Sequence, residues 1–114
     1  MGTVLIVEDH CASRDALREL VEKDGRAVVT AGDGQEALNR VRSIPPPSII
    51  LLDLAMPGMN GWEFLQNKTA DPTIAGIPTI VLSGSPSELP AGARDLLAKP
   101  VDIARLLALI DQYC

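Results

Sequence analysis

The most apolar stretch of the chain is SIILLD, residues 48–53. Its four aliphatic residues follow one another without a polar face, which is typical of a strand buried on both sides in a parallel sheet. Three consecutive prolines, residues 45–47, stand before it and favour a stiff loop after any preceding helix. Asp53 ends the run, so we predict a carboxylate at the carboxyl end of a central strand.

Shorter apolar runs alternate with helical patterns on both sides of this stretch. Further strands are predicted at residues 4–7, 27–31, 77–82 and 96–98. Apolar residues have helical spacing over 13–24, with Gly25 as a stop signal. Other helix starts are predicted at Asp33, Asn60 and Asp102. Because parallel strands need long crossover connections, this alternation predicts an α/β fold, a parallel sheet covered by helices on both faces.

A single domain spanning residues 1–114 is the expected organisation, because 114 residues suit one unit and 46% of them are hydrophobic. The formal net charge of −5 argues against direct binding to nucleic acid or anionic membranes, which requires clustered Lys and Arg. No apolar run approaches the roughly 20 residues that span a bilayer. The first apolar run leads straight into Glu8 and Asp9, unlike a signal peptide. We therefore expect a cytoplasmic protein without membrane insertion.

Polar side chains gather at the predicted strand ends. In chain order they are Glu8, Asp9, Asp53, Ser83 and Lys99. Ligands of open α/β sheets bind outside the carboxyl ends of the strands, so we expect these groups to converge on one cleft. Taken singly, each has a structural explanation as a solvated loop, turn or helix-start residue. Their shared position at strand ends favours a functional site.

Three carboxylates in one cleft repel one another, and a hard divalent cation relieves that repulsion. Oxygen ligands without His or Cys favour Mg²⁺, which binds a few carboxylates together with waters and a phosphate oxygen. A carboxylate there can also act as a nucleophile, as in enzymes that form an aspartyl phosphate. Lys99 supplies a point charge for a phosphoryl oxygen, and Ser83 supplies a hydroxyl donor. Phosphoryl transfer needs such positioning and charge neutralisation more than covalent help.

Four motifs along the chain resemble those of the receiver domains of response regulators. LIVED at 5–9 resembles the acidic signature that opens these domains, and DLAMPGMNG at 53–61 is similar to the segment around their phosphoacceptor. SG at 83–84 resembles the switch hydroxyl with its small neighbour, and KP at 99–100 resembles the Lys-Pro pair. The resemblance covers essentially the whole chain. It implies a flavodoxin-like, doubly wound sheet of five parallel strands in the order 2-1-3-4-5.

The resemblance also implies a role for each matching residue. Asp53 would accept a phosphoryl group from a histidine kinase or a histidine phosphotransfer protein, and Ser83 and Lys99 would contact that group. Mg²⁺ would be held by Glu8, Asp9, Asp53 and the backbone carbonyl of Ala55. The chain would then act on a downstream protein target in a two-component system. It would not be an enzyme in the usual sense, although it would take part in its own phosphoryl transfer and dephosphorylation.

Two departures from the family pattern concern the readout of phosphorylation. The family usually has Tyr or Phe three residues before the lysine, where this chain has Leu96, which offers neither a ring nor a hydroxyl. The stretch between Ser83 and Lys99 is shorter than usual, and its two prolines limit the family's fourth helix to about one turn. Both departures fall on the family's usual output and dimerisation face. We therefore expect the chain to relay its phosphoryl group or to signal through another face.

Two other functions stay open. A receiver without a working switch can be a docking module whose binding ignores phosphorylation; the altered readout favours this, and the complete set of site residues opposes it. An aspartyl-phosphate phosphatase or phosphotransferase for small molecules needs a further acid–base residue and a cap against water. His10 stands beside the acidic pair, but we expect it to be a loop residue. Cys11 and Cys114 have no metal-binding spacing, so we expect reduced, unpaired thiols.

Overall fold

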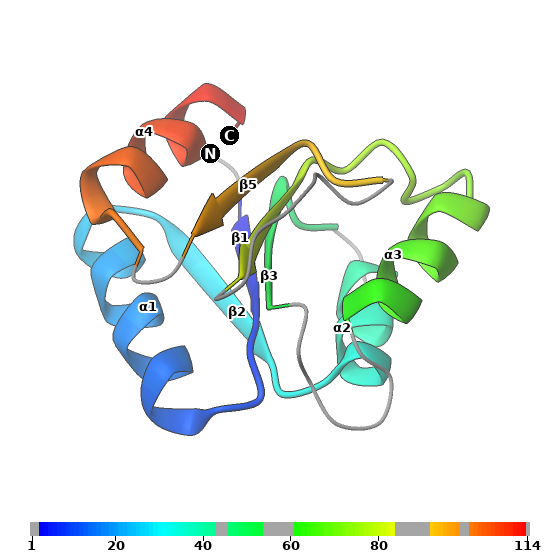
Figure 1. Ribbon diagram of the computed structural model, residues 1–114, viewed down its shortest axis with the longest axis horizontal. Helices are drawn as coiled ribbons and strands as arrows, with labels where there is room; N and C mark the ends of the chain where they lie inside the picture. The colour runs from blue at the N-terminus through cyan, green and yellow to red at the C-terminus, as the bar shows by residue number, and fades with distance from the viewer. Residues whose placement is uncertain (1–2, 43–45, 54–60, 84–91, 99–100, 114) are drawn as a thin grey trace.

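The computed structural model describes residues 3–42, 46–53, 61–83, 92–98 and 101–113 (Figure 1). The strands in these ranges are β1 (Thr3–Val7), β2 (Ala27–Ala31), β3 (Ile49–Asp53), β4 (Thr79–Ser83) and β5 (Asp95–Ala98). The helices are α1 (Cys11–Lys23), α2 (Gly34–Val41), α3 (Gly61–Ala70) and α4 (Ile103–Tyr113). None of these described helices is long and apolar enough to cross a membrane.

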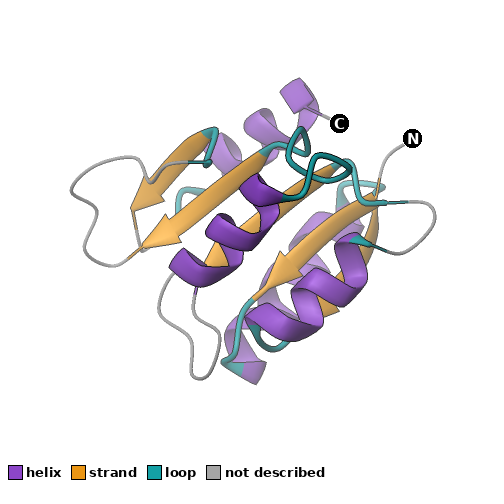
Figure 2. Cartoon of the chain, turned by 90° about the vertical axis from the view of Figure 1, so that its right-hand side faces the viewer, coloured by secondary structure: helices purple, strands orange, loops and turns teal. Residues whose placement is uncertain are grey.

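The strands run parallel in one sheet (Figure 2). Their order in the sheet is β2-β1-β3-β4-β5. This confirms the doubly wound order that the family resemblance implies. β3 is the central strand, and its apolar residues from Ile49 to Leu52 are completely buried. Val7 of β1 pairs with Leu52 of β3, so the residue that follows β1 comes level with Asp53. The register of the sheet therefore determines which side chains meet at its carboxyl edge.

Helices cover both faces of the sheet, with α1 and α4 on one face and α2 and α3 on the other (Figure 1). Side chains alternate between the two resulting cores because successive strand residues point to opposite faces. Val4 and Leu51 pack in the core under α1 and α4, while Leu5 and Leu52 pack in the core under α2 and α3. The prediction of a sheet covered on both sides is confirmed.

Helix ends follow the local sequence closely, with one difference. α1 begins at Cys11, two residues before the predicted start, because the ring Nδ1 of His10 accepts a hydrogen bond from the backbone N–H of Ser13 at 3.4 Å. The predicted stop is confirmed, since Gly25 follows the end of α1 with a φ of +88° that favours glycine. The predicted cap Asp33 accepts from the N–H of Glu36 at 2.8 Å.

The remaining predictions of local structure divide into two groups. Asp102 caps α4 as predicted, by accepting a hydrogen bond from the N–H of Arg105 at 3.2 Å. Other predictions fall outside the described residues, namely the helix start at Asn60, the carbonyl of Ala55 and Lys99. Most of the segment in which the shortened helix between β4 and β5 is predicted is also outside them. Of the segment before β5, residues 92–94 are described, and Gly92 has a φ of +90°.

Candidate metal and phosphoacceptor site

Glu8 is a buried carboxylate directly after β1. Its backbone N–H donates to the carbonyl oxygen of Ala31 at 3.0 Å, which continues the pairing with β2 beyond the end of the strand. Its side-chain Oε1 accepts a hydrogen bond from the backbone N–H of His10 at 3.1 Å, and only 3% of the residue is exposed. These contacts hold the carboxylate at the carboxyl edge of the sheet.

Asp53 is the last residue of β3 and is also buried, with 6% of its surface exposed. Asp9, the more exposed acidic residue, completes a cluster with Glu8 and Asp53 in which one oxygen from each carboxylate lies within 4.8 Å of the others. The cause is the pairing of Val7 with Leu52, which aligns the ends of β1 and β3. The structure therefore brings together the three carboxylates that the sequence analysis singled out.

The cluster has the chemistry of a site for a hard divalent cation. Its ligand atoms are all carboxylate oxygens, and two of the three residues are buried, so their mutual repulsion is poorly screened by water. A cation with a preference for oxygen relieves that repulsion, and Mg²⁺ also tolerates an incomplete set of protein ligands because it keeps waters. The residues present therefore fit a magnesium ion.

Ser83 lies at the same edge of the sheet, at the end of β4. Its neighbour Leu82 pairs with Asp53, and Ser83 itself pairs with Ala98 of β5. In the sequence Lys99 follows Ala98 directly, but Lys99 and Ala55 are outside the described residues. The described part of the predicted site thus consists of the acidic cluster with Ser83 at the end of the next strand.

Two residues near the cluster were missed as contributors to its geometry. His10 was expected to be a loop residue, and the structure makes it the N-cap of α1, next to the turn that carries the acidic pair. Arg14 donates a hydrogen bond from Nη1 to the backbone carbonyl oxygen of Glu8 at 3.2 Å. Histidine is not among the preferred N-cap residues, and a helical arginine is usually solvated, so neither had a clear sequence signal.

A buried lysine outside the acidic cluster also has an unusual electrostatic setting. Lys68 of α3 is 1% exposed, and its Nζ donates a hydrogen bond to the carbonyl oxygen of Ala75 at 3.0 Å. Burial lowers the pKa of Lys68 from its ordinary value of 10.5, and the positive charge of Arg94 lowers it further. Arg94 stands just before β5, so the segment that leads into β5 contributes to the electrostatic setting of Lys68.

The fold and the acidic edge together define a receiver of the chemotaxis type. The chain matches the family model for the response regulator receiver domain over residues 4–111. It is 33% identical to the protein PilH of Pseudomonas aeruginosa, with 97% of this chain and 96% of that protein covered. It is 34% identical to an uncharacterized 14.6 kDa protein of Leptolyngbya boryana, with 97% and 88% covered.

Solved structures give the same result. The chemotaxis protein CheY4 of Vibrio cholerae superposes with a TM-score of 0.89 at 28% identity, covering 100% of this chain and 99% of that one. The chain belongs to the family of response regulator receiver domains, which are signalling modules of two-component systems. Members of this family bind Mg²⁺ at an acidic pocket and interact with kinases or phosphotransfer proteins and with downstream targets.

Proposed function

We propose that this chain is a phosphoacceptor receiver that is phosphorylated on Asp53 by a histidine kinase or a histidine phosphotransfer protein. The observation that carries the proposal is the cluster of Glu8, Asp9 and Asp53, whose carboxylate oxygens lie within 4.8 Å of one another at the carboxyl edge of the sheet. A buried, crowded carboxylate beside two others is unfavourable without a cation, and family members bind Mg²⁺ at this place. We also propose that the protein acts in the cytoplasm, where the histidine kinase or phosphotransfer protein would meet it.

In the transfer step a carboxylate oxygen of Asp53 attacks the phosphorus of a phosphohistidine. An O–P bond forms while the N–P bond breaks, and the electron pair of that bond stays on the departing imidazole nitrogen, which takes up a proton from water. Mg²⁺ supplies positive charge that offsets both the carboxylates and the phosphoryl oxygens when it is bound. Glu8 and Asp9, with the carbonyl of Ala55, would hold the ion together with Asp53.

Ser83 and Lys99 are proposed to contact the phosphoryl group once it is on Asp53. A serine hydroxyl donates to one phosphoryl oxygen, and a lysine ammonium pairs with another as a point charge. The position of Ser83 after Leu82, the register partner of Asp53, supports its part. The proposed role of Lys99 rests on the family resemblance and on its position directly after β5 in the sequence. The dephosphorylated state would be restored by hydrolysis at the same carboxylate.

The experiment is an intact-mass measurement after incubation with Mg²⁺ and acetyl phosphate. The wild type should gain one phosphoryl group, and Asp53→Asn should gain none, since an amide is a poor nucleophile. Asp15→Asn is the matched control, because Asp15 is an exposed aspartate of α1 that pairs with Arg18 at 3.7 Å and lies outside the acidic cluster. Asp15→Asn should gain the group as the wild type does. No phosphoryl gain from acetyl phosphate or from a panel of histidine kinases and phosphotransfer proteins would refute the proposal.

A docking module that ignores phosphorylation is the second candidate. The observation that favours it is Leu96, which stands where the family usually has an aromatic ring and is partly buried against the core that includes Val81. An aliphatic side chain packed in this way has no ring to move in response to Ser83. Amide hydrogen exchange of the wild type with and without acetyl phosphate distinguishes the two. Unchanged exchange in β4 and β5 of a fully phosphorylated sample would favour the docking module.

A further inference from the structure

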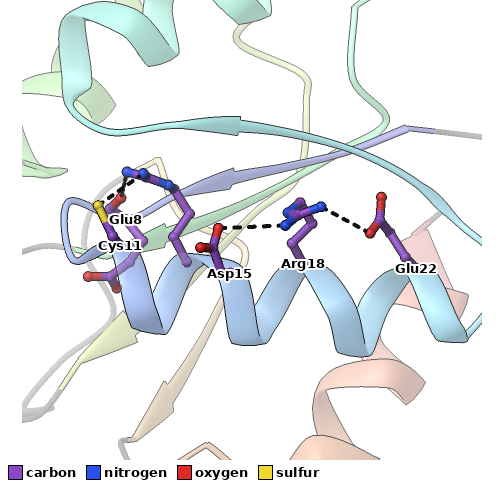
Figure 3. A network of polar contacts seen from close by, with 6 residues as sticks. Glu8, Cys11, Asp15, Arg18 and Glu22 are labelled. Atoms are coloured by element: carbon purple, nitrogen blue, oxygen red, sulfur yellow. Dashed lines mark hydrogen bonds and ion pairs between the residues drawn. The ribbon is translucent and has the colours of Figure 1, made fainter.

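Arg14 reaches from α1 back to the turn that carries the acidic pair. Its Nη1 donates a hydrogen bond to the backbone carbonyl oxygen of Glu8 at 3.2 Å, and its Nη2 lies 3.3 Å from Sγ of Cys11. Figure 3 shows Glu8 and Cys11 close together at the start of α1, joined by these contacts. The guanidinium therefore bridges Glu8, the residue after β1, and Cys11, the first residue of α1.

The carbonyl that Arg14 contacts belongs to the peptide bond between Glu8 and Asp9. Because a peptide is planar, fixing its oxygen also fixes the direction in which the chain enters Asp9. The rest of the turn is held by other bonds, from the N–H of Glu8 to Ala31 at 3.0 Å and from the N–H of His10 to Glu8 Oε1 at 3.1 Å. The Arg14 contact acts on the one peptide that separates the two acidic side chains.

Gly32, the residue after β2, leaves space for this guanidinium. A Cβ atom at that position would lie 3.1 Å from Nη1 of Arg14, closer than a carbon atom normally approaches. The backbone of Gly32 does not have the positive φ that would itself require glycine. A side chain at position 32 would therefore require the end of the Arg14 side chain to shift by a few tenths of an ångström, so the two positions are physically linked.

We propose that Arg14 is a positioning residue for the metal-binding pair, because it orients the Glu8–Asp9 peptide and thereby places the Asp9 carboxylate. This inference rests on the proposed function, since it concerns the same Mg²⁺ site. Partners that hydrogen-bond directly to metal ligands typically change metal affinity by roughly 10–100-fold when they are removed. Arg14 acts through the backbone beside the ligand, so its removal should weaken Mg²⁺ binding by about three- to tenfold.

Because Arg14 is positively charged, the direction of the change in Mg²⁺ affinity distinguishes two roles for it. A positive side chain near a cation site disfavours the cation, so removing that charge alone would tighten Mg²⁺ binding. Loss of positioning has the opposite effect and weakens binding. Weaker binding by Arg14→Met therefore indicates positioning, and tighter binding indicates that the arginine acts only through its charge.

The test is the affinity for Mg²⁺ alone, measured by isothermal titration calorimetry on the full chain. Arg14→Met should raise the dissociation constant about three- to tenfold, and Arg14→Lys, which retains a donor, should recover part of the loss. Arg18→Met is the matched control, because Arg18 lies one turn further along α1 and pairs with Asp15 at 3.7 Å and Glu22 at 3.4 Å (Figure 3). Its affinity should equal that of the wild type.

Two further variants separate positioning from general stability. In an Asp9→Asn background, Arg14→Met should have little additional effect on Mg²⁺ affinity, since the ligand that it positions is already lost. Gly32→Ala retains the arginine but places a Cβ atom 3.1 Å from its Nη1, so the guanidinium must shift and Mg²⁺ binding should also weaken. That variant decides the question if Arg14→Met fails to fold.

The outcomes distinguish this inference from the proposed function. If the wild type binds Mg²⁺ and is phosphorylated on Asp53 while Arg14→Met and Gly32→Ala bind Mg²⁺ as tightly as it does, the inference is overturned and the proposed function stands. A lower melting temperature with an unchanged dissociation constant also overturns it, because the role would then be structural. A wild type that neither binds Mg²⁺ nor takes a phosphoryl group would remove both.

Discussion

The β1–β3 pair and the β4–β5 pair belong to the same parallel sheet, but their carboxyl ends are built differently. At the end of β1 and β3, the buried carboxylates of Glu8 and Asp53 extend from strands whose apolar side chains are completely or almost completely buried. At the β4–β5 end, Leu96 is only partly buried and replaces the ring that the family usually has. The acidic cluster is retained in this chain, whereas position 96 of β5, where the family usually has an aromatic ring, holds a leucine.

The β4–β5 side is constrained in its own way. Gly92, just before β5, has a φ of +90°, and a Cβ atom there would lie 2.6 Å from Oγ1 of Thr69 on α3. Arg94 then stacks over the ring of Tyr113 at the end of α4, 5.4 Å from the ring centroid. The segment that leads into β5 therefore contacts both α3 and α4. The difference between the two pairs teaches that a buried acidic site can stand in the same sheet as an edge strand whose side chains are less completely buried.

The largest expected difference between the two pairs is in stability. Leu51→Ala in β3 should lower the free energy of unfolding by about 3 kcal/mol, because it leaves a cavity in a completely buried strand. Leu96→Ala in the edge strand β5 should cost only about 1 kcal/mol, since less apolar surface is lost. Urea unfolding followed by circular dichroism measures both. Equal losses would show that β5 is packed as firmly as β3 and would remove this contrast.

A smaller effect is expected when the family's ring is restored. Leu96→Tyr should change the free energy of unfolding by less than about 1 kcal/mol, because the side chain lies on an edge strand and reaches solvent. Phosphorylation of Asp53 by acetyl phosphate should proceed as in the wild type, since the acidic cluster is untouched. Intact mass over time and urea unfolding give the two readouts. Loss of phosphorylation in this variant would mean that the two strand pairs are not independent.

The smallest effect concerns Lys68 of α3, the buried lysine that is influenced by the charge of Arg94 before β5. Burial, with help from Arg94, lowers the pKa of Lys68 below 10.5, so between the lowered pKa and 10.5 the unfolded chain binds more protons than the folded one. The stability contribution of this group therefore rises as the pH rises through that window. Lys68→Met should remove the rise.

The measurement is the melting temperature of both proteins at a series of alkaline pH values up to about 10.5. The melting temperature of the wild type should rise relative to that of Lys68→Met as the pH increases. The effects of titratable groups that both proteins share cancel in the difference. Parallel curves would show that Lys68 keeps its ordinary pKa in the folded protein, despite its burial and its bond to Ala75.

Much of the fold could be predicted from local features of the sequence. The apolar run at 48–52 predicted the central strand, and Asp33, Asp102 and Gly25 predicted helix boundaries that the structure confirms. The start of α1 was harder to predict from the sequence, because the histidine that caps it belongs to no common capping pattern. Local signals succeed where the stabilising partner lies within a few residues of the same chain segment.

The candidate site was predictable in its residue types and less so in its geometry. Strand-end positions singled out Glu8, Asp9 and Asp53, and the resemblance to receiver domains gave each a proposed role. The contact of Arg14 with the Glu8 carbonyl had no sequence signal, since arginines on helices are usually solvated. Lys68 shares its helix face with Phe64 and Leu65, but only the carbonyl of Ala75 at 3.0 Å shows where its charge is accommodated.

The sequence by itself determined the alternation of strands and helices, the caps that bound several helices and the residues for which a phosphoryl-transfer role is proposed. These features depend on backbone periodicity and on hydrogen bonds between near neighbours in the chain. Only the tertiary structure decided that the Glu8 and Asp53 carboxylates meet and that Arg14 lies over Gly32. Those contacts depend on the register of parallel strands and on how α1 packs, which are fixed by burial of the whole core and not by any one segment.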